Sequence, residues 1–325
     1  MIRWAGLLAV AGLVLATGLI LHQGLGAIVA ALGAAGLGIL WSGLFHIVPM
    51  ALNARAWQIL LPGARKPGLA FFTGAVWVRE AVNGLLPVAR IGGEVASARL
   101  LRRRGVRNAP TLASLVVDMT LSILSQALFA LLGIALLALR GELGGAWPIA
   151  LALLAALPLV ALLVAVQHLG LFGLLGRIFE TVLGDRLAGL LGSAIRLDRA
   201  IRQFYRRRDR ILACTLWQLA GWVAGAGEIW LALHFLGHPV GLAEAVIVEA
   251  LIQAVSSAAF LVPGALGVQE GGFLAVGALV GLPADTALAL ALTRRARDLL
   301  LFVPALLAWQ AAEGRALWRR ARAAG

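Results

Sequence analysis

Long uncharged apolar stretches are the feature that most constrains how this chain can fold. Five stretches carry at most one charged side chain each: residues 4–21, 25–52, 109–139, 147–166 and 211–236. A helix needs about 20 apolar residues to cross the hydrocarbon core of a bilayer. Lipid offers backbone groups no partner, so such stretches favour helices. We predict spans there and a sixth over residues 286–312, which carries charges at its centre.

The composition agrees with a membrane protein that crosses the bilayer several times. The chain of 325 residues is 61% hydrophobic and 13% charged, whereas soluble domains have roughly 45–50% apolar and about 25% charged residues. This excludes an ordinary cytosolic enzyme, a disordered chain and a fibrous protein. The single cysteine, Cys214, excludes an internal disulfide and a cysteine metal cluster.

The basic residues predict the orientation of the spans. They concentrate in residues 55–107, 177–210 and 315–322, whereas the alternate loops hold only Arg140. Lysine and arginine accumulate on the cytoplasmic side, so we expect both termini in the cytoplasm. The net charge of +13 is then a signature of insertion, and no room remains for a basic domain that would bind nucleic acid.

Residues 171–210 predict an amphipathic helix at the cytoplasmic interface, within a region of about 168–210. Apolar residues recur there at helical spacing with charges between them, and a basic cluster follows at 206–210. Such a cluster serves as an anchor on anionic lipid heads. Specific lipid capture by Tyr205–Arg208 is the alternative.

Two further segments, 68–104 and 241–281, are too polar for a simple span and too apolar for a loop. In the first, Arg79, Glu80 and Asn83 lie within one helical turn. In the second, a polar stripe at helical spacing comprises Glu249, Gln253, Ser256 and Ser257. Both continue into a proline and a glycine-rich stretch, which predicts a broken helix.

The two breaks resemble each other. Glu94 stands seven residues after Pro87, and Glu270 stands seven residues after Pro263. A span with an acid follows each break, Asp118 in one case and Asp298 in the other. We interpret this as an internal repeat within a single membrane domain, with repeat A at about 25–139 and repeat B at about 211–312.

Three spans separate the copies, so the second copy is inverted relative to the first. The predicted fold is therefore all-α, with about six transmembrane helices and two re-entrant broken-helix hairpins in an inverted repeat. Inverted repeats with broken helices at matching places are typical of transporter sites near the midplane.

The embedded charges indicate where a substrate would bind. One charge at a helix centre costs on the order of 2.5–3.5 kcal/mol on the insertion scale, so these groups must pair or face water. Arg294 and Asp298 are four residues apart, as are Arg90 and Glu94. The alternative is that such pairs only hold the repeats together. The predicted substrate-binding residues are Arg79, Glu80, Asn83, Pro87, Arg90, Glu94, Asp118, Gln253, Pro263, Glu270, Arg294, Arg297 and Asp298.

No catalytic pattern is found, so we expect neither an enzyme nor a cofactor or metal. The five histidines lack metal-ligand spacing, and Pro239 follows the pair His234 and His238. There is no nucleophile elbow and no phosphate-binding loop with its lysine. Arginines and helix ends in a polar cavity instead suit an anionic lipid headgroup.

The broken segments carry a family resemblance. The runs NGLLPVARIGGE from Asn83 to Glu94, LVVD ending at Asp118 and PGALGVQE from Pro263 to Glu270 resemble the flippase-like membrane domain of the lysylphosphatidylglycerol synthase family. Residues 45–46, 79–83 and 114–118 look most like the hopanoid-biosynthesis-associated membrane proteins. The resemblance implies a lipid flippase or lipid-handling protein of the bacterial inner membrane, not an aminoacyl transferase.

Three functions remain open at this stage. The first is translocation of an anionic or hopanoid-type lipid. The second is a non-transporting membrane subunit that partners lipid-biosynthesis enzymes. The third is a membrane enzyme using Glu94, Asp118, Glu270 and Asp298, which lack a nucleophile or a metal-binding histidine. The sequence predicts no oligomeric state.

Overall fold

A computed structural model describes residues 33, 36–61, 63, 66–86, 92–141, 165, 167, 188–258 and 268–323. Each described element is a helix. The predicted span at 4–21 and nearly all of that at 147–166 lie outside the described residues, as do Pro87, Arg90 and Pro263.

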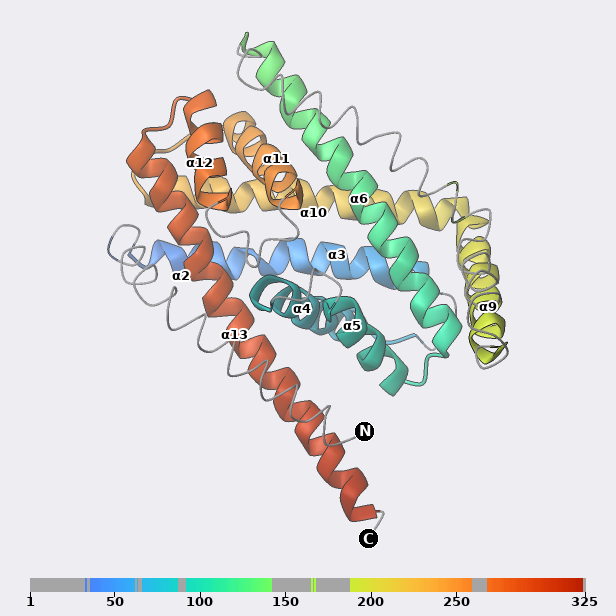
Figure 1. The fold of residues 1–325 in the computed structure, drawn as a ribbon. Helices are drawn as coiled ribbons and strands as arrows, with labels where there is room; N and C mark the ends of the chain where they lie inside the picture. The colour runs from blue at the N-terminus through green and yellow to red at the C-terminus, as the bar shows by residue number, and fades with distance from the viewer. Residues whose placement is uncertain are drawn as a thin grey trace.

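Two short helices replace the described part of the predicted span at 25–52. Helix α2 (Gly38–Phe45) and helix α3 (Ile47–Leu60) follow one another along nearly the same line, with His46 between them (Figure 1). Pro49 explains the break, because proline lacks an N–H and its ring clashes with the carbonyl four residues earlier, here that of Phe45. Helix α3 continues beyond the predicted end, past Arg55 to Leu60.

Helix α10 (Arg208–Phe235) lies antiparallel against α2 and α3 (Figure 1). Its first turn meets the end of α3, where the Arg210 guanidinium donates to the carbonyl oxygens of Ile59 and Leu61. At the opposite end a Cβ on Gly38 would collide with Phe235. Small residues allow this close approach of helix backbones.

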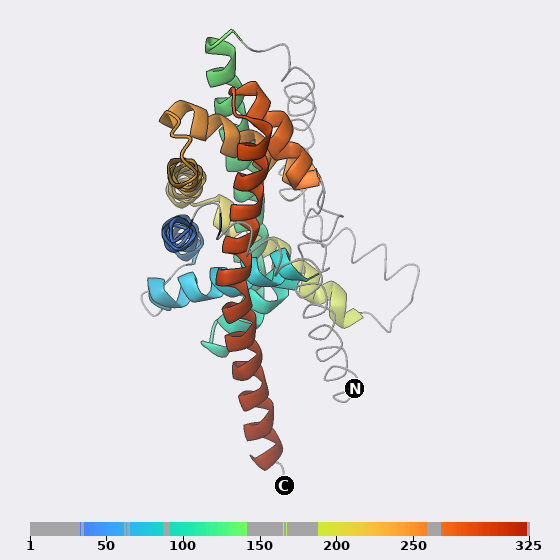
Figure 2. The ribbon, with the colours of Figure 1, turned by 90° about the vertical axis from the view of Figure 1, so that its left-hand side faces the viewer.

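Two helical hairpins pack beside this pair of rods. The first consists of α4 (Leu69–Leu85) and α5 (Gly92–Arg103), and the second of α11 (Leu242–Ala258) and α12 (Val268–Leu279). In each hairpin the two helices contact each other. Figure 2 shows the second hairpin beside the start of the last helix and the first hairpin further along it.

A long helix follows each hairpin: α6 (Asn108–Leu139) after the first and α13 (Ala284–Ala323) after the second. The starts of α5 and α12, at Gly92 and Val268, are 176 residues apart, and so are the starts of α6 and α13, at Asn108 and Ala284. Helices α6 and α13 run in opposite directions (Figure 1). A hairpin followed by a long helix thus occurs twice in the chain, and the two long helices run in opposite directions.

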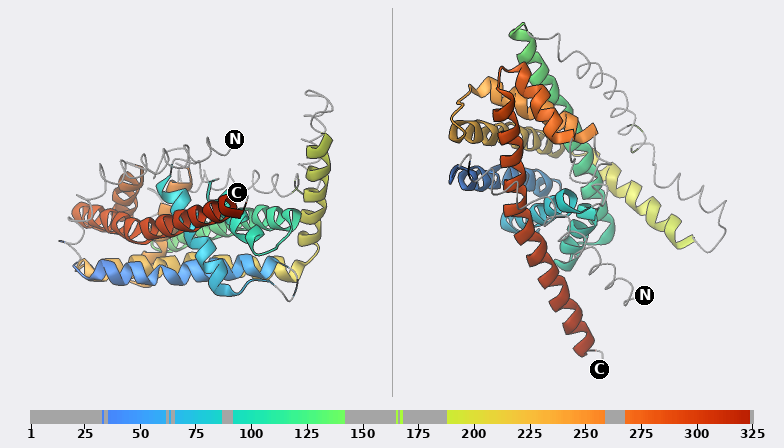
Figure 3. Two further views of the ribbon diagram at one scale, coloured as in Figure 1. Left: turned by 90° about the horizontal axis from the view of Figure 1, so that it is seen from below. Right: turned by 60° about the vertical axis from the view of Figure 1, so that its left-hand side comes forward.

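Helix α9 (Ala188–Tyr205) covers most of the described part of the predicted amphipathic region, but the basic cluster at 206–210 lies beyond it and leads into α10. Helix α9 crosses α10 steeply (Figure 3) and packs on α6, with Ile201 and Phe204 buried. The steep crossing is the geometry of a helix lying across the end of the bundle.

Large apolar side chains cover much of the outer surface, including Trp41, Leu139, Leu212 and Leu242. Among the described helices, α6 alone is both long and apolar enough to cross a membrane by itself. The interior is apolar near Trp57 and Phe72 at one end and near Leu233 and Phe273 at the other. Charged groups gather between these two apolar regions.

Candidate functional site

A buried ion pair attaches the first hairpin to α6. Arg79 of α4 donates from Nη1 to Asp118 Oδ2 at 2.7 Å, and Glu94 Oε2 of α5 lies 3.8 Å from the same nitrogen. Gln218 of α10 donates to Asp118 Oδ1 at 2.8 Å. The Arg79 guanidinium also lies over the Trp57 ring, 5.6 Å from its centroid. One arginine of α4 therefore contacts three other helices, α3, α5 and α6.

The first hairpin is closed by a hydrogen bond near its tip. The Gly93 backbone N–H donates to Asn83 Oδ1 at 2.8 Å. A Cβ on Gly93 would lie 2.4 Å from the Arg79 carbonyl oxygen. Only glycine allows the start of α5 to come this close to the α4 backbone.

A second buried ion pair attaches the second hairpin to α13. Arg294 donates to Glu249 Oε2 of α11, with both side chains almost fully buried. Gln253 donates to Glu249 Oε1 at 2.7 Å. Gln126 of α6 donates to Ser257 Oγ at 2.6 Å, so the second hairpin is also bonded to the long helix of the other half.

Helix α12 has its own link to α13. Arg295 donates from Nε to Glu270 Oε1 at 2.6 Å. Because Arg294 and Arg295 are adjacent, α13 contacts both helices of the second hairpin through neighbouring guanidinium groups.

His46 lies at the centre of a third group that joins the two halves. Its Nδ1 is 2.8 Å from Glu228 Oε2 of α10, and its Nε2 is 3.2 Å from Glu80 Oε2 of α4. Arg297 of α13 donates to Glu228 Oε2 at 3.2 Å and contacts His46 Nδ1. Arg297 Nε also lies 3.1 Å from Asp298 Oδ1.

No three histidine, cysteine or acidic side chains of the described residues are arranged to hold a metal ion. In the His46 group the Arg297 guanidinium already neutralises Glu228. The groups of this arrangement can exchange hydrogen-bond partners. A guanidinium becomes available to another acceptor only when its existing ion pair opens.

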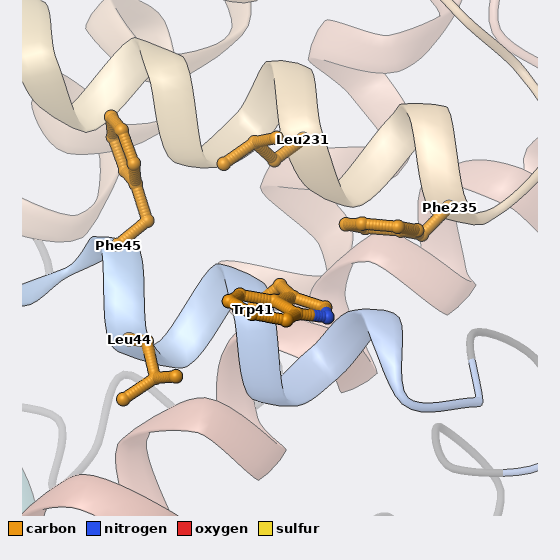
Figure 4. Close-up of a pocket in the computed structure, with 5 residues that line it drawn as sticks. All are labelled: Trp41, Leu44, Phe45, Leu231 and Phe235. Carbon is orange, nitrogen blue, oxygen red and sulfur yellow. The ribbon is translucent and has the colours of Figure 1, made fainter.

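An apolar pocket of about 420 Å³ lies between α2 and α10 (Figure 4). Its lining residues are Trp41, Leu44, Phe45, Leu231 and Phe235. Trp41 and Leu44 are more than half exposed. Phe45 precedes His46 in the chain, so the pocket adjoins the polar group without contributing to it.

Cations without a described carboxylate partner gather at the end of α3. Lys66 Nζ donates to the Gln58 carbonyl oxygen at 3.2 Å, and Arg55 donates to Gln58 Oε1 at 2.6 Å. Burial lowers the pKa of Lys66, and the nearby charges of Arg210 and Arg55 lower it further. The C-terminal end of a helix dipole stabilises such cations.

Comparison of the sequence with known protein families identifies the family of this chain. A family model described as the lysylphosphatidylglycerol synthase TM region matches residues 3–306. The chain belongs to this family. No curated protein and no solved structure matches it. Membership makes the protein a lipid-related membrane protein, and the match includes both hairpins and α6.

Within this family member, most of the predicted site residues lie in the buried groups. Arg79, Glu94 and Asp118 meet at the first hairpin, and Asn83 closes that hairpin. Gln253, Glu270 and Arg294 lie at the second, while Glu80, Arg297 and Asp298 lie around His46. Pro87, Arg90 and Pro263 lie outside the described residues, so their prediction stays open.

Two predicted relationships differ in the structure. The nearest carboxylate to the Arg294 guanidinium is Glu249 rather than Asp298. Counted from the helix starts, the counterpart of Asp118 is Arg294, since each is ten residues into its long helix. The ion pair on the long helix therefore has reversed polarity in the two halves.

The sequence reasoning left His46, Glu228, Glu249, Arg295 and Gln218 out of the predicted site. Glu228 is the one acid of an otherwise uncharged predicted span, and Pro49 follows His46 by three residues. The isolated acid and the nearby proline were sufficient to select Glu228 and His46 from the sequence. Nothing in the sequence signals that Gln218 faces Asp118 from 100 positions away.

Proposed function

We propose that this protein binds a membrane lipid by its headgroup between the two hairpins and translocates it across the bilayer. The observation that carries the proposal is the pair of buried arginine–carboxylate contacts, Arg79–Asp118 and Arg294–Glu249, one at each hairpin. Ionisable groups inside a membrane domain mark substrate pathways more often than they stabilise a fold.

Exchange of partners would connect lipid binding to hairpin movement. A guanidinium binds a phosphate through two parallel hydrogen bonds, as it does a carboxylate. A phosphate that enters between α4 and α6 takes the place of Asp118 as the partner of Arg79, and the Asp118 carboxylate keeps the hydrogen bond from Gln218. The hairpin is then no longer attached to α6 by that pair. An anionic phospholipid or a hopanoid-type lipid with a polar head is the expected ligand.

The end of the bundle where basic residues gather suggests how the protein is oriented in the membrane. Arg55, Lys66 and Arg210 lie there, as do the exposed Arg102 and Arg103 at the end of α5. We place this end in the cytoplasm of a bacterial inner membrane, with both termini on that side. The first hairpin then enters from the cytoplasm and the second from the outer side.

Lipid exchange in proteoliposomes tests the proposal. We expect Arg79→Gln to slow headgroup translocation at least about tenfold, since it removes the proposed phosphate ligand. Arg103→Gln is the matched control, because Arg103 lies on the same hairpin but pairs with Glu313 at the surface. It should translocate lipid like the wild type. Equal rates for wild type and Arg79→Gln contradict the proposal.

A second function is a non-transporting subunit that presents lipid to biosynthetic enzymes. The observation in its favour is that each arginine of the three buried groups lies within ion-pair distance of a carboxylate, which suits a static scaffold. Such a subunit copurifies with lipid, detectable by mass spectrometry, yet leaves headgroups on their original side of the vesicle.

A further inference from the structure

His46 is placed between two carboxylates that belong to different helices. Its Nδ1 faces Glu228 of α10 at 2.8 Å, and its Nε2 faces Glu80 of α4 at 3.2 Å. The residue itself stands at the junction of α2 and α3, outside both helices. The imidazole ring is therefore a bridge from the bundle to the first hairpin and to α10.

The bridge depends on a proton. A neutral imidazole has one N–H, whereas the imidazolium has two. Two ionised carboxylates can both accept from the ring only when it is protonated. A neutral ring keeps one of these hydrogen bonds and presents a lone pair at the other nitrogen. Arg297, which contacts Nδ1, can donate to that lone pair.

Three carboxylates and one guanidinium lie around the ring. Glu80 faces it from α4 and Glu228 from α10, while α13 contributes Arg297 and, beside it, Asp298. Phe302 approaches the ring at 6.2 Å between centroids and carries no charge. Arg294, also on α13, is paired with Glu249.

The three buried groups together hold more acid than arginine. Their described members include seven carboxylates and four arginines: Glu80, Glu94, Asp118, Glu228, Glu249, Glu270, Asp298, and Arg79, Arg294, Arg295, Arg297. Four of the carboxylates, Glu80, Glu94, Glu270 and Asp298, are 21–30% exposed, so protons from outside the bundle can neutralise this excess of negative charge. The imidazole between two of these acids is a natural acceptor.

The site has a wet side and a dry side. The side chain of Glu80 is 26% exposed and that of Asp298 is 30% exposed, whereas that of Glu228 is 5% exposed. The Glu80 side is therefore the more accessible route for a proton to His46. Carboxylate and histidine chains of this kind form proton relays in membrane transporters.

We propose that His46, Glu80 and Glu228 form a proton-binding site that joins α4 to α10 through the ring when occupied and loses one of these two links when empty. Helices α4 and α10 both pack on α3, and in this proposal α4, as part of a hairpin, moves relative to α10. Under the proposed lipid function, on which only this step rests, a proton gradient then drives the first hairpin and with it the lipid.

A distance measurement tests the site without any lipid movement. Nitroxide labels at the exposed positions Leu69 of α4 and Leu216 of α10, with the buried Cys214 replaced by alanine, report the separation of the two helices. Spectra are recorded at about pH 5.5 and about pH 8.5, either side of the ordinary histidine pKa. We expect the distance distribution to lengthen at the higher pH and to be independent of pH in His46→Gln.

His234→Gln is the matched control, since that ring stacks on Trp230 away from the charged group. His234→Gln should retain the pH response. Glu80→Gln should lose it. An identical distribution at both pH values in the His46 protein, or an unchanged response in His46→Gln, overturns the proposed site.

Proteoliposomes with an imposed pH gradient then test the coupling. We expect the gradient to change the initial rate of lipid movement by at least about fivefold in the wild type and by less than about twofold in His46→Gln. A wild-type rate that ignores the gradient overturns the coupling. A pH-dependent distance in a protein that moves no lipid supports the proton site and contradicts the proposed function instead.

Discussion

Asp118 lies within an apolar helix because polar groups from two other helices surround its carboxylate. Arg79 donates to one of its oxygens and Gln218 to the other. Removing one partner from a buried ion pair leaves a charge without compensation and costs about 3–5 kcal/mol. The position of α4 relative to α6 therefore depends on this contact.

Gly93 is the residue whose substitution most directly tests the first hairpin. A methyl group there would collide with the Arg79 carbonyl and with Asn83. We expect Gly93→Ala to destabilise the protein by about 1–3 kcal/mol, as overpacking does. Thermal unfolding in detergent measures the change.

Gly271, in the first turn of α12, provides the control. A Cβ at this position meets nothing within 4 Å. Alanine in an open helical position is neutral or favourable by about 0.5–1 kcal/mol relative to glycine. Equal unfolding temperatures for Gly93→Ala and Gly271→Ala contradict the close approach of α4 and α5.

At the scale of the helices, the sequence was sufficient to locate those with strong apolar patterns. The predicted span at 109–139 is α6, Asn108–Leu139, and the stretch at 211–236 forms helix α10, Arg208–Phe235, although α6 alone of the described helices is long and apolar enough to span by itself. Apolar periodicity and length determine such helices. The pattern does not say which polar residue faces which, so the pairing of Arg294 with Glu249, 45 residues away, was not predicted.

The break between α2 and α3 has a cause that the sequence does contain. Pro49 interrupts the backbone hydrogen bonds, and His46, which lies at the break, contacts Glu228 and Glu80. The predicted continuous span overlooked this local effect. In physical terms, an apolar stretch satisfies the membrane whether or not the helix within it is straight.

Substitution of Pro49 tests the role of the break. We expect Pro49→Ala to restore a continuous helix through His46, to move the imidazole from the carboxylates and to abolish the pH response of the distance between α4 and α10. Proline in a helix interior costs about 3 kcal/mol, so the helix itself should not be weakened. The nitroxide distances at the two pH values measure the effect.

Pro110→Ala is the matched control for this change. Pro110 lies in the first turn of α6, where no helix precedes it, and proline is tolerated there. This variant should keep the wild-type pH response. A retained response in Pro49→Ala contradicts the role assigned to the break.

At the scale of the whole molecule, two hairpins of opposite sense converge on charged groups that lie between two apolar regions. Helices α6 and α13 run in opposite directions, and each hairpin contacts both of them through polar side chains or backbone. Each bond of a hairpin to the bundle can open separately. This geometry suits alternate opening toward the two sides of a membrane.

The opposite orientation of the halves is most directly measured by labelling the two long helices at their first residues. Asn108 and Ala284 are both exposed and occupy matching positions. Single cysteines there, with Cys214 replaced by alanine, are treated with a membrane-impermeant maleimide in intact cells and in inverted vesicles. The account predicts that Ala284→Cys reacts only in cells and Asn108→Cys only in inverted vesicles. Labelling of both positions from the same side contradicts it.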